Sequence, residues 1–169
     1  MIKIITSLIT NDKPGIIEQL AKIVTHHNGN WEASNFSQLA GKFAGVVEIS
    51  VAEEQQTQLI TALQQLQQAD FIIDIATSSL SNEQAKTSHI IEVTGNDRNG
   101  IIKDVSSVLA KNNINVLKLS SETSPAPNWG GNLFKAIIEI QASDTNAIDA
   151  AIDGLESITD DLIVDITLL

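Results

Sequence analysis

One short motif occurs twice in this chain, as Asn11-Asp12-Lys13-Pro14-Gly15-Ile16-Ile17 and as Asn96-Asp97-Arg98-Asn99-Gly100-Ile101-Ile102. In each copy, an apolar run typical of a buried strand precedes the motif, and apolar residues at helical spacing follow it. Self-similarity of this kind is typical of a duplicated structural unit. The motif therefore predicts two copies of one small domain.

The similarity continues beyond the motif. Asn30 follows the first predicted helix, and Asn115 stands at the equivalent place after the second. Near the end of each half, Ile72-Ile73-Asp74-Ile75 matches Ile163-Val164-Asp165-Ile166. The second half also carries a longer loop, Ser124–Asn132, so the chain is a duplication with one enlarged loop.

Apolar periodicity predicts the same order of elements in each half. In the first half it predicts strands at Met1–Thr10, Asn30–Leu39, Lys42–Val51 and Phe71–Ala76, and helices marked by Ile16, Leu20, Ile23 and Val24 and by Leu59, Leu63 and Leu66. In the second half it predicts strands at Ser88–Thr94, Ile114–Glu122, Leu133–Gln141 and Leu162–Leu169, and helices marked by Ile101, Val105, Val108 and Leu109 and by Ile148, Ala151, Ile152 and Leu155.

This order, β-α-β-β-α-β, predicts an α+β fold in which two helices cover one face of an antiparallel sheet. Pro14 suits the first turn of its helix, and Gly29 suits a left-handed cap at the end of that helix. The polar stretch Ser78–Thr87 lacks periodicity. We therefore expect domains at residues 1–79 and 88–169, joined by a linker at 80–87.

The composition argues against several classes of function. The net charge is −11, with 10 basic and 21 acidic side chains, whereas binding to a phosphate backbone needs clustered cations. We therefore expect no direct contact with nucleic acid. The absence of cysteine excludes disulfides and thiolate sites. The first apolar run is too short for a membrane span, so a cytoplasmic location without a membrane partner is expected.

The repeated loops are the candidate binding sites. The free N–H groups at a helix start attract a carboxylate, and a glycine there permits close approach of a ligand. Asp12 and Asp97 could hold an ammonium group, with amide hydrogen bonds from Asn30 and Asn115. The alternative is that the two aspartates only cap the helices.

No pattern in the chain indicates catalysis. There is no nucleophile elbow, phosphate-binding loop or dinucleotide fingerprint, so no catalytic residue, metal or cofactor is expected. Trp129, in the enlarged loop, could contact a partner or fold back onto its own sheet.

The element order, the Asn-Asp-Lys-Pro-Gly-Ile-Ile opening and Asn30 resemble the ACT domain, a family of small regulatory modules that often bind amino acids. The tandem arrangement and length resemble the glycine cleavage system transcriptional repressor family. Asn99 departs from the pattern at the position of Pro14. The resemblance implies an amino-acid site between domains and edge-to-edge pairing of sheets, as in a homodimer. The implied ligand residues are Asn11, Asp12, Gly15, Ile16 and Asn30 in the first copy, and Asn96, Asp97, Gly100, Ile101 and Asn115 in the second.

We therefore expect a regulatory protein, not an enzyme, that senses a small amino acid such as glycine. It would act on transcription through a protein partner such as an activator. One alternative is a constitutive adaptor without a ligand. Another is a small acylphosphatase-like enzyme on the same scaffold, which would need a cationic loop where this chain has acidic ones.

Overall fold

The computed structural model describes residues 1–78, 88–126, 131–142, 145–158 and 163–168. The chain divides into two compact units, unit 1 (Met1–Asn82) and unit 2 (Glu83–Leu169). The expected linker at 80–87 and Trp129 lie outside the described residues.

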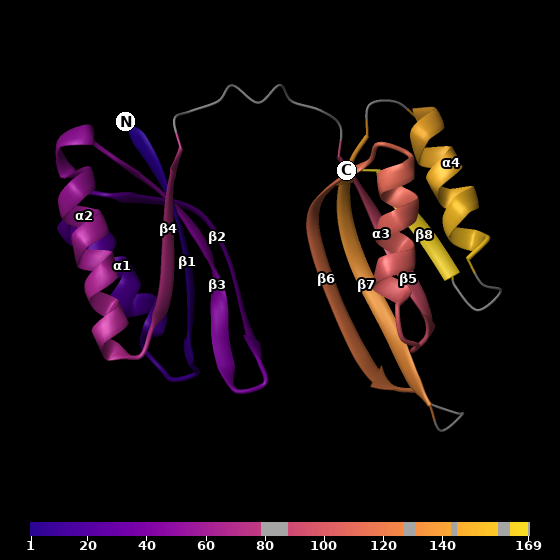
Figure 1. Ribbon diagram of the computed structural model, residues 1–169, viewed down its shortest axis with the longest axis horizontal. Helices are drawn as coiled ribbons and strands as arrows, with labels where there is room; N and C mark the ends of the chain where they lie inside the picture. Colours follow the sequence, from indigo (N-terminus) through magenta and orange to yellow (C-terminus); the bar gives the residue numbers. More distant parts are fainter. Residues whose placement is uncertain (79–87, 127–130, 143–144, 159–162, 169) are drawn as a thin grey trace. The chain divides into compact units, whose positions relative to one another are not determined.

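Each unit repeats the predicted element order, and two helices cover one face of its sheet (Figure 1). Unit 1 contains β1 (Ile2–Asn11), α1 (Ile16–His26), β2 (Asn30–Leu39), β3 (Lys42–Val51), α2 (Glu53–Gln65), the short 3-10 helix η1 (Leu66–Ala69) and β4 (Ile72–Ser78). Unit 2 contains β5 (Ser88–Asn96), α3 (Ile101–Lys111), β6 (Asn115–Pro125), β7 (Asn132–Gln141), α4 (Thr145–Glu156) and β8 (Ile163–Leu168). The predicted α+β fold is therefore confirmed.

Both sheets are antiparallel and have the same strand order, β2-β3-β1-β4 in unit 1 and β6-β7-β5-β8 in unit 2. The edge strands β2 and β6 carry a bulge at the same place, at Glu32 in β2 and at Leu117 in β6. The enlarged loop does not disturb this correspondence, because β6 and β7 remain paired up to Pro125 and Asn132.

Each unit has its own apolar core between its helices and its sheet. The predicted helical stripes supply it, and the side chains that are almost fully buried include Leu20, Leu59 and Leu63 in unit 1 and Val105, Leu109 and Leu155 in unit 2. The strands supply the opposite wall, with Ile4 and Ile49 in unit 1 and Ile91 and Ile138 in unit 2. The sheet and helices thus form a rigid support for the loops at their ends.

The predicted position of the left-handed cap after α1 is wrong by one residue. Asn28 has the positive φ of 54°, and Asn113 has the same value after α3. Asparagine tolerates this conformation because its short polar side chain can bond locally. Gly29 is needed for space instead, since a Cβ there would lie 3.1 Å from Ile49 Cγ2.

Candidate functional site

The two motif loops have nearly the same backbone conformation. Gly15 precedes α1 with φ 93° and ψ 0°, and Gly100 precedes α3 with φ 87° and ψ 6°. This left-handed conformation favours glycine. A Cβ at either position would meet nothing within 4 Å, so the space beside each loop is open. Asn99 in place of Pro14 leaves the loop geometry intact.

Each helix begins after its glycine, so Pro14 lies before the first turn rather than within it as predicted. The first helical hydrogen bonds run from Gln19 N–H to Gly15 O at 2.9 Å and from Asp104 N–H to Gly100 O at 3.0 Å. The three N–H groups before each of these donors have no intrahelical partner. No side chain caps either helix start, so the alternative that Asp12 and Asp97 only cap the helices is wrong.

The aspartates are held by their backbones, and their carboxylates are exposed. Asp12 N–H donates to Gly41 O at 3.1 Å, and Asp97 N–H donates to Asn132 O at 2.8 Å. These bonds tie each loop to the start of the neighbouring strand, β3 or β7. Within the described part of the chain, neither carboxylate accepts a hydrogen bond. Each carboxylate is therefore available to a ligand.

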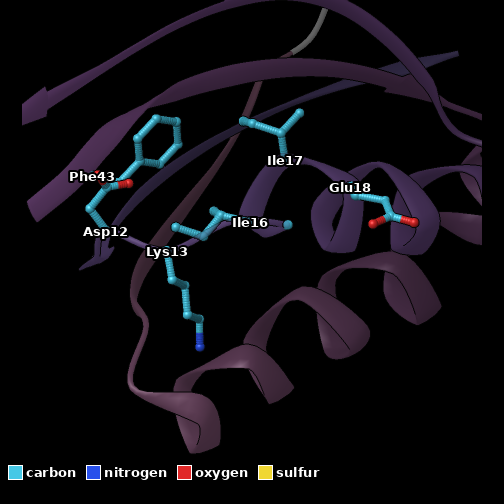
Figure 2. A pocket seen from close by; sticks show the side chains of 7 residues that line it. Asp12, Lys13, Ile16, Ile17, Glu18 and Phe43 are labelled. Atoms are coloured by element: carbon cyan, nitrogen blue, oxygen red, sulfur yellow. The ribbon is translucent and has the colours of Figure 1, made fainter.

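A pocket of about 390 Å³ adjoins the first loop (Figure 2). Phe43 and Ile17 stand on two sides of it, and Lys13 extends away from Phe43. The complete lining comprises Asp12, Lys13, Gly15, Ile16, Ile17, Glu18 and Phe43. The pocket thus combines a helix start, charged side chains and an apolar wall.

Two of the three charged residues that line the pocket already have partners in unit 1. Glu18 Oε1 lies 2.6 Å from Lys22 Nζ. The hydrogen bond from Lys22, followed by its charge, holds the pKa of Glu18 below the ordinary value. Lys13 Nζ lies 5.9 Å from the centre of the Phe71 ring, within range of a cation–π contact. Asp12 is therefore the charged lining residue that remains free for a cation.

The apolar wall is part of an aromatic cluster. The Phe43 ring stacks on Phe36 with centroids 5.4 Å apart and an interplanar angle of 5°, and Phe36 lies 6.0 Å from Trp31. Phe36 covers Gly45, where an added Cβ would come within 2.4 Å of Phe36 Cδ1. Gly45 thus allows the Phe36 ring to lie close to β3, where Phe43 can stack on it.

The second loop has different surroundings. Arg98 Nη2 lies 2.7 Å from Asp104 Oδ2, at positions that hold Lys13 and Gln19 in unit 1. Asp104 lies in the first turn of α3, where a carboxylate interacts favourably with the helix start. Phe134, the counterpart of Phe43, is only 5% exposed. Both helices therefore have an acidic residue in the first turn, but Glu18 of α1 is paired with Lys22 further along its helix, whereas Asp104 of α3 is paired with Arg98 of the loop.

The structure brings most of the predicted site residues together. Asn11, Asp12, Gly15 and Ile16 lie at one loop, and Asn96, Asp97, Gly100 and Ile101 lie at the other. Asn11 Oδ1 accepts a hydrogen bond from Lys42 Nζ at 2.6 Å, whereas Leu133 faces Asn96 in unit 2.

Asn30 and Asn115 lie at the opposite end of their sheets from the loops. Asn30 is paired with Ser50, which is paired with Lys3, whereas Asn11 is paired with Lys42. The distance along β1 from Lys3 to Asn11 is roughly 26 Å at about 3.3 Å per residue. Asn115 has the same position in unit 2, beside Gln141 and Ser88. Neither asparagine reaches the loop of its own unit, so the expected nearby amide is not found there.

Asn30 instead contacts the bulge of β2. Its Nδ2 donates to Glu32 Oε1 at 2.9 Å, and Ser50 Oγ donates to the same oxygen at 2.5 Å. These two bonds, that from Ser50 first, lower the pKa of Glu32. Leu117 occupies the Glu32 position in unit 2, so this arrangement is specific to unit 1.

Four residues of the pocket were not among the predicted site residues. Lys13 lies inside the repeated motif, between Asp12 and Pro14. Ile17 and Glu18 follow the predicted loop directly, and Ile17 belongs to the repeated motif itself. Phe43 matches Phe134 in the repeat, but it lies on a different element from the loop. Only the pairing of Phe43 with Thr10, at the end of β1, brings it to the pocket.

Among the described residues, no group of three or more His, Asp or Glu side chains could hold a metal ion. In the same part of the chain, no helix is both long and apolar enough to cross a membrane.

The fold and the paired loops define a protein built from two small α+β domains, each with an open helix start at one end of its sheet. The chain belongs to the ACT domain family, with one ACT domain matched at residues 3–76 and another at residues 89–157.

Solved structures are similar over the whole chain. An unknown protein from Galdieria sulphuraria has 25% sequence identity and a TM-score of 0.80, covering 100% of this chain and 99% of its own. A protein provisionally described as a glycine cleavage system transcriptional repressor has 19% identity and a TM-score of 0.73, covering 99% of this chain and 97% of its own. No curated protein sequence matches the chain.

Proposed function

We propose that this chain is a non-enzymatic regulatory protein that binds a free amino acid at the loop of unit 1. The observation that carries the proposal is the free Asp12 carboxylate beside unpaired N–H groups at the start of α1, at the edge of a pocket of about 390 Å³. A zwitterion matches this arrangement, because its ammonium group would bind Asp12 and its carboxylate would bind the helix start.

The proposed role of the second loop is structural. Asp104 and Arg98 already place a carboxylate and its counter-ion beside the start of α3. A ligand carboxylate there would lie beside Asp104, which Arg98 holds at the loop, whereas Glu18 of α1 is paired with Lys22. We therefore expect Asn96, Asp97, Gly100, Ile101 and Asn115 to contribute less to ligand binding than their counterparts in unit 1.

The proposed output is a contact with another protein. Because the net charge of −11 disfavours contact with DNA, an effect on transcription would pass through a protein partner. The likeness of fold to the provisionally described glycine cleavage repressor suggests this setting. A homodimer formed edge to edge would cover strand β2, which has no neighbour on its outer side within the described sheet, and could bring Asn30 to the loop of a second copy.

Binding of free amino acids should raise the melting temperature of the full chain. A ligand at one hundred times its dissociation constant would add about 2.7 kcal/mol to the free energy of unfolding. Asp12→Ala should abolish this response because it removes the counter-ion of the ammonium group. The melting temperature without ligand should stay nearly unchanged, since Asp12 is exposed and does not cap α1.

Asp97→Ala is the matched control, and we expect it to keep the full response. If no amino acid shifts the melting temperature of the unmodified chain, the proposed sensor is wrong and a constitutive adaptor is favoured. A full response in Asp12→Ala would contradict the assigned role of Asp12.

A further inference from the structure

The apolar wall of the unit 1 pocket is partly exposed, although Phe43 also packs against the core of unit 1. Ile17 is 40% exposed, and Phe43 is only half-buried. They come from different elements, α1 and β3, yet both border the same space (Figure 2). A single exposed isoleucine is ordinary, but two large apolar side chains around one pocket form an apolar surface whose exposure to water is unfavourable.

Unit 2 has the same residue types but does not form the same wall. Ile102, the counterpart of Ile17, packs against the core of unit 2, and Phe134 is 5% exposed. The neighbours of the phenylalanine also differ. In unit 1, Phe43 stacks on Phe36, which lies over Gly45. Unit 2 has Ser121 in place of Phe36 and Ala136 in place of Gly45, so no ring is present at the Phe36 position to stack on Phe134.

The charges around the pocket disfavour a ligand with a charged side chain. Glu18 is paired with Lys22, and the Lys13 ammonium group lies by the Phe71 ring. Asp12 is needed for the ligand ammonium group under the proposed function. The pocket volume of about 390 Å³ lies near the lower end of small-molecule sites, which span roughly 300–1,000 Å³. A single amino acid fits this size better than a peptide or a nucleotide cofactor.

We infer that the unit 1 pocket selects an α-amino acid with a large apolar side chain, such as leucine or methionine, over glycine. The side chain would lie against Ile17 and Phe43, while the ammonium and carboxylate groups bind as described under the proposed function, on which this inference rests. Glycine would satisfy the polar groups and leave the apolar wall uncovered.

Isothermal titration of the full chain with glycine and with L-leucine tests the inference. Because leucine would bury its side chain on the wall, it should bind about 10- to 100-fold more tightly than glycine. Isoamylamine, which is leucine without its carboxylate, should bind more weakly than leucine because it cannot use the helix start. Equal affinity for glycine and leucine would overturn the inference and leave the proposed amino-acid sensor intact. If neither compound nor any other free amino acid binds, both fail.

Ile17→Ser tests the assigned wall. It should weaken leucine binding about tenfold and leave glycine binding unchanged, because only leucine covers that position. The melting temperature of the ligand-free variant checks that the fold is preserved, as expected for a side chain that is 40% exposed. Ile102→Ser is the control in unit 2 and should leave both affinities unchanged. Its melting temperature without ligand is measured as well, because Ile102 packs against the core of unit 2. If the control variant weakens leucine binding as much as Ile17→Ser does, the assignment to unit 1 is wrong.

Discussion

At the scale of single residues, the duplication allows each position of unit 1 to be compared with the equivalent position of unit 2. Gly15 and Gly100 keep the same backbone conformation, whereas Lys13 and Gln19 are replaced by Arg98 and Asp104. The repeated motif predicted both glycine loops correctly. It could not predict the ion pair between Arg98 and Asp104, because Asp104 lies two residues beyond the motif and Gln19 holds its position in unit 1.

Thr6 is a residue at which the two units differ in core chemistry. It is fully buried, and its hydroxyl has no hydrogen-bond partner among the described residues, whereas its counterpart is the buried Ile91. Thr6→Val should raise the free energy of unfolding by about 1 kcal/mol, because a buried unpaired hydroxyl is replaced by a methyl group. The midpoint of urea unfolding measures this change.

Thr61→Val provides the comparison. Thr61 is exposed and its hydroxyl donates to Thr57 O at 2.8 Å, so its replacement should not stabilise the chain. If Thr6→Val lowers the unfolding midpoint, an ordered water must satisfy the Thr6 hydroxyl and the expected gain is wrong.

At the scale of elements, periodicity predicted every α-helix and strand of the described residues but not the short helix η1, and the other errors fall at the ends of elements and in their placement. The cap at Asn28 was assigned to Gly29, because both residue types can adopt the required conformation. Asn30 was expected near the loop, but the order of elements puts it at the far end. Since α1 returns the chain to the start of β1, the next strand begins there. The sequence already showed this order of elements. The position of Phe43 beside the loop depends instead on the strand register, which pairs Phe43 with Thr10.

The β2–β3 hairpin has an unfavourable residue in its turn. Ala40 has φ 50° and Gly41 has φ 77°, the pair of positive φ values of a type I′ turn. The left-handed conformation costs an ordinary residue about 1–2 kcal/mol, and asparagine tolerates it better. Ala40→Asn should therefore raise the free energy of unfolding by about 0.5–1 kcal/mol, as measured by thermal and urea unfolding.

Ala40→Val should have the opposite effect, because a β-branched side chain is strained in this conformation. Equal stability of the two variants would mean that the turn relaxes into another conformation, and the stated cause would be wrong.

At the scale of the whole molecule, each unit contains its own core, and the described residues of each core come from that unit. The repeat predicted this organisation, and the family match supports it over both halves. The proposed boundary at residue 79 lies among residues outside the described part, so expression of a single unit is its direct test.

Residues 1–79 expressed alone should fold and unfold in one cooperative transition, because a domain of about 80 residues can bury enough surface to be stable. Circular dichroism during thermal unfolding measures this transition. Residues 88–169 serve as the matching fragment. A gradual, non-cooperative loss of signal from residues 1–79 would contradict an independent first domain.

Trp31 makes changes in the aromatic cluster observable by fluorescence. Its ring lies 6.0 Å from Phe36, which stacks on Phe43 at the pocket. The chain has two tryptophans, so a chain with Trp129 changed to phenylalanine emits indole fluorescence from Trp31 alone. A ligand that displaces Phe43 would alter the surroundings of that emitter through Phe36. Stopped-flow fluorescence could then follow arrival and departure of the ligand in real time without any attached dye.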